Sequence, residues 1–151
     1  MPKRLVFIAH APSDNTKALK EAAYAAIMET ELEVQILAPQ DVSQHSLDDA
    51  DGLFLGMIEN LASMSGLMKD VFDRCYDSWI DAHRGLPLAV YIRAGNSGIG
   101  TTRQLDQIVT GLGWRMVQPP LLLVGAYRKD FSNQTAELAC GFAHGVEMGL
   151  F

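Results

Sequence analysis

Residues 10–16, with the sequence His-Ala-Pro-Ser-Asp-Asn-Thr, place several hydrogen-bonding side chains at a predicted change of secondary structure. The apolar run 5–9 before them has the length of a strand, and alanine-rich helical spacing follows them. Such a loop offers unpaired backbone N–H groups and the positive end of a helix dipole, so it predicts a phosphate-binding site. Its side-chain donors are His10, Ser13, Asn15 and Thr16. An ordinary capped turn is the alternative, because Ser, Asp, Asn and Thr are also preferred N-cap residues.

Two further loops also lie between a predicted strand and a predicted helix. The apolar runs 52–58 and 86–93 are each followed by a loop and then by helical spacing. In an open parallel sheet, the loops at the carboxyl ends of neighbouring strands meet at one crevice, where ligands bind. We therefore expect the three loops to form a single site.

Alternation of strands and helices extends along the whole sequence. Apolar runs of strand length occur at 5–9, 33–37, 52–58, 86–93 and 120–125, and helical patterns separate them, the last two near 101–112 and 133–147. Near-continuous apolar runs indicate strands that are covered on both faces. The pattern predicts an α/β fold, and 151 residues suit a single domain, 1–151.

Residues 64–74, with the sequence Met-Ser-Gly-Leu-Met-Lys-Asp-Val-Phe-Asp-Arg, carry the most specific family signal. Together with loops 10–16 and 94–100, in this order and at these spacings, they resemble the flavodoxin-like superfamily. The similarity is greatest to its short NAD(P)H-dependent FMN reductases and flavodoxin-family proteins. The resemblance covers nearly the whole chain. It implies a three-layer sandwich, with a five-stranded parallel sheet of order 2-1-3-4-5 and helices on both faces.

The resemblance also implies a function, that of an FMN-binding oxidoreductase. Such a protein transfers electrons from NAD(P)H to a small molecule, a flavin or a redox protein. The first loop would hold the FMN phosphate, and the other two would lie along the ring. The residues assigned to the ring are Glu59, Asn60, Ala62, Met64, Gly95, Asn96, Ser97 and Gly98. Because the cofactor carries the electron chemistry, no catalytic acid, base or nucleophile is expected.

The second loop departs from the family pattern. At 56–63 the chain reads Gly-Met-Ile-Glu-Asn-Leu-Ala-Ser, with no aromatic ring to stack on a flavin and no Thr-Pro pair. An open ring face favours direct hydride transfer from a nicotinamide. Two alternatives stay open, namely a flavodoxin-type electron carrier and a flavin-free binding module.

Composition excludes several other classes. A net charge of −6 opposes general nucleic-acid binding. The two cysteines lack metal-ligand spacing, and no histidine has a partner at such spacing, so no metal site is expected. No apolar run has the length of a membrane span, and no signal peptide is evident at the amino end. We therefore expect a cytoplasmic protein, and both a monomer and a homodimer fit the sequence.

Overall fold

The computed structural model describes residues 1–151 and contains one sheet, four α-helices and a short 3₁₀ helix. The strands are β1 (Arg4–Ala9), β2 (Glu33–Leu37), β3 (Gly52–Asn60), β4 (Ser63–Met64), β5 (Pro87–Ala94), β6 (Arg115–Met116) and β7 (Leu121–Val124). The helices are α1 (Asp14–Ile27), η1 (Pro39–Asp41), α2 (Gly66–Trp79), α3 (Ile99–Leu112) and α4 (Asp130–Glu147). None of them combines the length and the apolar character needed to cross a membrane.

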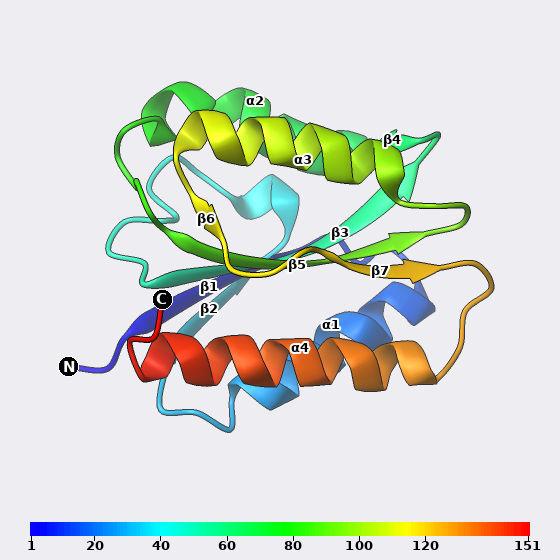
Figure 1. Ribbon diagram of the computed structural model, residues 1–151, viewed down its shortest axis with the longest axis horizontal. Helices are drawn as coiled ribbons and strands as arrows, with labels where there is room; N and C mark the ends of the chain where they lie inside the picture. Colours follow the sequence, from blue (N-terminus) through cyan, green and yellow to red (C-terminus); the bar gives the residue numbers. More distant parts are fainter.

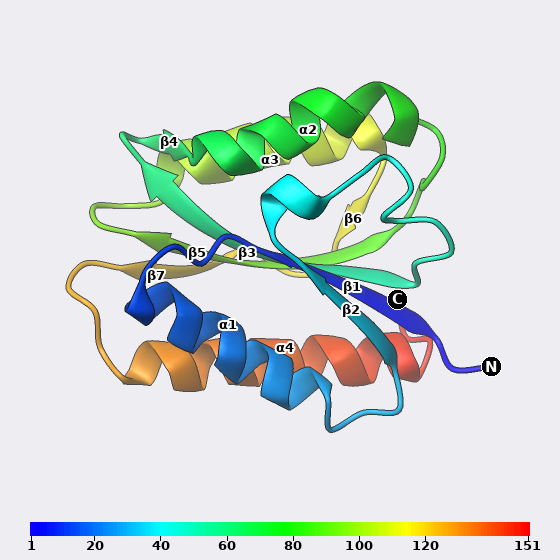
Figure 2. The same cartoon turned by 180° about the vertical axis from the view of Figure 1, so that it is seen from behind.

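The sheet lies between two helical layers. Helices α2 and α3 cover one face, and α1 and α4 cover the other (Figure 1; Figure 2 shows the reverse side). A separate apolar core fills each space between sheet and helices, because alternate residues of the central strands point to opposite faces. Val6 and Ile8 belong to one core, while Leu5 and Phe7 belong to the other. The predicted three-layer α/β sandwich is confirmed.

The order of the main strands is also confirmed. The sheet follows β2-β1-β3-β5-β6, and these strands are parallel. It has seven strands rather than five, because the edge strand is divided and β4 adds a short antiparallel hairpin to β3. β6 pairs with the start of β5, and β7 pairs with its end. Pro119 and Pro120 lie between the two pieces, and proline has no N–H to donate to a ladder.

The register of the central strands brings the three loops to one edge. Ala9, Gly56 and Tyr91 lie side by side across β1, β3 and β5. The N–H of His10 donates to the carbonyl of Gly56 at 2.9 Å, which ties the first loop to β3. We call this side of the sheet the carboxyl edge. Both chain termini lie at the opposite side (Figure 1).

Candidate functional site

The first loop forms a capping box at the start of α1. The Ser13 hydroxyl accepts a hydrogen bond from the Thr16 N–H at 3.2 Å, and the Ser13 N–H donates to the Thr16 hydroxyl at 3.0 Å. The two hydroxyl oxygens are 2.8 Å apart. Thr16 is buried, whereas Ser13 and Asn15 are exposed. The capped turn is therefore present, and Thr16 stabilises the loop from below its surface.

The same loop keeps donors for a ligand. The N–H groups of Asp14 and Asn15 open α1, where helix geometry provides no acceptor, and no side chain caps them. The exposed Asn15 amide has no partner within the chain, and the Ser13 hydroxyl lies two residues before it in sequence. Two features oppose an anion: Pro12 has no N–H, and Asp14 adds a carboxylate. The donor set suits a phosphate, with one negative side chain next to it.

His10 links this loop to the start of α2. Its Nδ1 lies 2.8 Å from the hydroxyl oxygen of Ser65, which is buried at the N-cap of α2 and makes no capping hydrogen bond. Burial lowers the pKa of His10 below its ordinary value. The imidazole is therefore neutral at pH 7, and it offers a hydrogen bond rather than a positive charge.

The second loop is a tight hairpin between β3 and β4. Leu61 and Ala62 form its turn with positive φ angles of 53° and 62°, and Leu61 is fully exposed. Two-residue hairpins favour this backbone, but non-glycine residues adopt it at a cost of roughly 1–2 kcal/mol each. Asn60 is exposed, whereas Met64 is buried in the core beneath α2 and α3. Met64 therefore packs inside the protein, away from any ligand at the surface.

Glu59 points to α3. One carboxylate oxygen accepts the N–H of Gly98 at 3.0 Å, and the other accepts the N–H of Thr101 at 3.0 Å. Burial alone would raise the pKa of Glu59, but hydrogen bonds from Thr101 and Gly98 outweigh it, so the pKa lies below its ordinary value. Glu59 thus serves as the anion at the N-terminus of α3.

Three more residues complete what we call the junction, formed by Glu59, Ala62, Gly100 and Gln104. The side-chain oxygen of Gln104 accepts the Met64 N–H at 2.7 Å, and its amide nitrogen donates to Ser63 at 2.9 Å. A Cβ at Gly100 would lie 1.8 Å from the carbonyl oxygen of Ala62. The hairpin and α3 are therefore in direct contact. No spacing in the sequence distinguished Gln104 or Thr101, because their partners lie about 40 residues away.

The third loop leaves two donors free. Gly98 caps α3 with a φ of +77°, a backbone that favours glycine, and its N–H is taken by Glu59. The Ser97 hydroxyl accepts from the N–H of Ile99 at 3.2 Å. Gly95 and Asn96 are exposed, and their N–H groups make no hydrogen bond within the chain.

These residues fit FMN in their donor chemistry. The start of α1 can hold a phosphate, and the N–H groups of Gly95 and Asn96 can meet the oxygen and nitrogen atoms of a flavin edge. A ring has no room between the hairpin and α3, because the backbone of Ala62 already touches Gly100. The predicted site residues therefore divide into two groups. Ser13, Asn15, Asn60, Ala62, Gly95 and Asn96 are exposed at the carboxyl edge, while His10, Thr16, Glu59, Met64, Ser97 and Gly98 make contacts that hold the loops together.

Charge is unevenly distributed over the molecule. The loops of the carboxyl edge, the strand ends that enter them and the first turns of their helices carry five basic and four acidic residues, whereas the whole chain has a net charge of −6. The basic residues are Lys17, Lys69, Arg93, Arg128 and Lys129, and the acidic residues are Asp14, Asp41, Glu59 and Asp130. This edge is therefore less acidic than the rest of the protein, so it repels an anionic ligand less than the other surfaces do.

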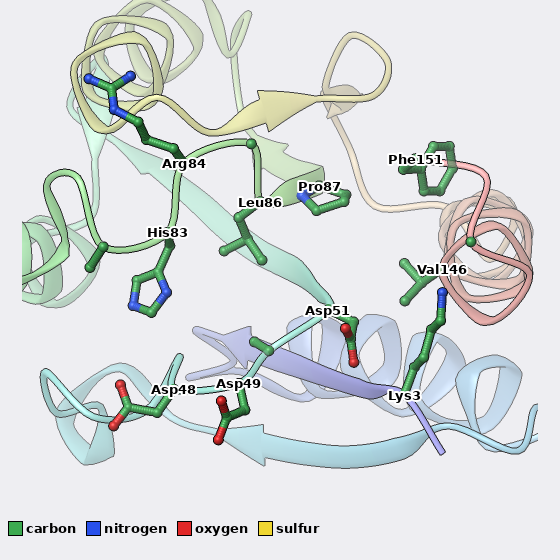
Figure 3. Close-up of a pocket in the computed structure, with 14 residues that line it drawn as sticks. Lys3, Asp48, Asp49, Asp51, His83, Arg84, Leu86, Pro87, Val146 and Phe151 are labelled. Carbon is green, nitrogen blue, oxygen red and sulfur yellow. The ribbon is translucent and has the colours of Figure 1, made fainter. Parts of the chain in front are cut away.

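The principal cavities lie elsewhere. One of about 760 Å³ opens at the amino ends of the strands, and Figure 3 shows that Asp48, Asp49 and Asp51 line one side of it while His83 and Arg84 line another. A second, of about 350 Å³, lies beside β7 and α4. None of the predicted site residues lines either cavity. No group of three or more His, Cys, Asp or Glu side chains is placed to hold a metal ion.

Known structures share this architecture. A flavodoxin from the domain Archaea superposes with a TM-score of 0.77 at 19% sequence identity, over 95% of this chain and 98% of that one. Flavodoxin 1 from Bacillus cereus superposes with a TM-score of 0.79 at 20% identity, over 94% and 98%. The flavodiiron protein from Giardia intestinalis gives a TM-score of 0.80 at 9% identity, where 95% of this chain matches 36% of the longer one. No protein-family model and no curated protein matches the sequence. The chain therefore has the flavodoxin-like fold.

Proposed function

We propose that this chain is an FMN-binding redox protein that passes electrons from NAD(P)H to a small-molecule acceptor. The observation that carries the proposal is the presence of unpartnered donors at two places on the carboxyl edge. One set opens α1 at Asp14 and Asn15, and the other is at Gly95 and Asn96. The similarity in fold to flavodoxins supports the choice of a flavin over other phosphorylated ligands.

Each group of residues has a distinct task. The N–H groups at the start of α1, with the Ser13 hydroxyl and the Asn15 amide, bind the phosphate. Gly95 and Asn96 donate to the ring edge, and glycine at position 95 lets the backbone approach closely. His10 holds the first loop against α2 through Ser65. Bound FMN supplies the hydride and electron chemistry, so the protein needs no acid or base of its own.

The choice of electron donor rests on shape and charge. None of the residues 56–63 or 95–98 is aromatic, so the loops bring no ring that would cover a flavin face. The carboxyl edge is less acidic than the rest of the protein, so an anionic dinucleotide meets less repulsion there than at the other surfaces. Both features favour a nicotinamide dinucleotide as the reductant.

Anaerobic stopped-flow mixing tests this proposal. The FMN-loaded protein is mixed with NADPH or NADH, and we expect the absorption band of the oxidised flavin to disappear. Lys129→Gln removes one exposed positive charge from the carboxyl edge and should raise the KM for the dinucleotide. Arg115→Gln is the matched control, since it removes one exposed charge from β6 at the opposite edge. If neither nucleotide reduces the flavin and a redox protein does so in a salt-dependent manner, the chain is an electron carrier.

A further inference from the structure

The first N–H groups of α3 are hydrogen-bonded by a residue outside the helix. Its N-cap is Gly98, which has no side chain to cap the first N–H groups of the helix. Glu59, at the end of β3, accepts two of those groups, from Gly98 and Thr101, at 3.0 Å each. A carboxylate in this position also neutralises the positive end of the helix dipole. The N-terminus of α3 is therefore occupied by the protein itself, and the start of α1 is left for a ligand phosphate.

The loop that carries Gly95 and Asn96 connects β5 to this helix. Its far end is fixed by the Glu59 bond to Gly98, two residues beyond Asn96. Between Ala94 and Gly98, the loop has one side-chain bond of its own, from the Ile99 N–H to Ser97. The near end is fixed by β5, where the Ala94 carbonyl accepts the Gly125 N–H at 3.0 Å. The placement of the two free N–H groups thus depends both on β5 and on where Glu59 holds the start of α3.

We propose that Glu59 is a positioning residue for the ligand edge of the third loop. It holds Gly98 against the hairpin, so the N–H groups of Gly95 and Asn96 stay in place for a flavin ring. This inference rests on the proposed function. In this inference Glu59 acts on the ligand by holding the third loop, and it does not contact the flavin ring itself.

The position of Glu59 in the molecule distinguishes the positioning of the third loop from a general role in stability. Glu59 belongs to neither apolar core, and it is only partly buried. We therefore expect its removal to leave the packing of α2 and α3 on the sheet unchanged. Glu59→Gln keeps the size of the side chain, but its NH₂ group cannot accept a hydrogen bond, so it can satisfy one N–H donor instead of two. Glu59→Ala satisfies neither.

The test compares ligand affinity with local hydrogen exchange. In Glu59→Ala, we expect exchange of the Gly98 and Thr101 amides to accelerate by about tenfold or more, with an unchanged far-ultraviolet circular dichroism spectrum. Affinities for FMN and for riboflavin should fall by the same factor, because both share the ring. Asn15→Ala should weaken FMN alone, because it removes a phosphate contact. Glu59→Gln should lie between the parent and Glu59→Ala in both measurements.

Gln104→Ala is the matched control, since it releases the hairpin side of the junction and leaves both Glu59 bonds in place. It should not change exchange at Gly98. Unchanged exchange at Gly98 and Thr101 in Glu59→Ala would overturn the inference, and so would accelerated exchange with parent-like flavin affinity. Loss of the circular dichroism spectrum would assign Glu59 to folding and overturn it as well. Failure of the proposed function is a separate result, seen as absence of flavin binding to the parent protein.

Discussion

Replacement of Gly100 by alanine tests the contact between the hairpin and α3. The added Cβ would lie 1.8 Å from the carbonyl oxygen of Ala62 and 2.8 Å from its carbonyl carbon. Both are backbone atoms, so rotation of a side chain cannot relieve the clash. Ordinary contact begins near 3.4 Å, and the hairpin must therefore retreat by about 1.6 Å.

That retreat stretches the hydrogen bonds that the Glu59 carboxylate accepts from α3 and those that Gln104 makes with the hairpin. Overpacking costs about 1–3 kcal/mol, and each broken hydrogen bond adds about 0.5–1.5 kcal/mol. Higher helix propensity offsets roughly 1 kcal/mol of this loss, because alanine replaces glycine in α3. We expect a net loss of about 2–4 kcal/mol in the free energy of unfolding, measured by urea denaturation.

The control is Gly141→Ala, in the exposed middle of α4, where an added Cβ meets no atom within 4 Å. It should stabilise the protein by about 0.5–1 kcal/mol. A Gly100→Ala variant with the stability of the parent would refute the close packing of the hairpin on α3. It would also remove the reason for excluding a ring from that space.

Three further predictions concern charge and pH. The pKa of Glu59 is lowered in the folded state. Its contribution to stability is therefore present above about pH 4.5, and it is lost as the pH falls through the lower pKa of the folded protein. Glu59→Gln should remove this part of the acid dependence in urea titrations at pH 3–7. Burial raises the pKa of Tyr91, so stability should decrease above about pH 10, and Tyr91→Phe should reduce that decrease. Asp14→Asn removes a carboxylate from the start of α1 and should tighten FMN binding severalfold without changing riboflavin binding, as measured by fluorescence titration at low salt.

Much of the fold was predictable because buried positions are occupied by apolar residues, whose spacing can be read from the sequence. The runs 5–9 and 86–93 are apolar along their length, as strands covered on both faces must be, and they form β1 and β5. The division of the edge strand into β6 and β7 was harder to predict from the sequence. Proline at positions 119 and 120 marks a place where a ladder cannot continue, but the pairing of Arg115 with β5 depends on the tertiary fold.

The candidate site was predictable as a region and less so residue by residue. Ser13 and Thr16 suit both a phosphate and a capping box, and residue type alone does not separate these uses. The role of Glu59 depends on N–H groups that lie 39 and 42 residues further along the chain. Met64 follows a turn whose geometry directs its side chain into the core. Contacts of this kind arise from the packing of distant segments.

Titration calorimetry with FMN and with riboflavin tests the central claim most directly, because the two ligands share the ring and differ in the phosphate. The N–H groups of Asp14 and Asn15 predict that FMN binds at least about tenfold more tightly than riboflavin, since each hydrogen bond to a charged group contributes about 1.5–3 kcal/mol. Equal affinity for the two ligands would contradict the phosphate site at α1. Failure to bind either flavin would contradict the proposed function and favour a flavin-free binding module.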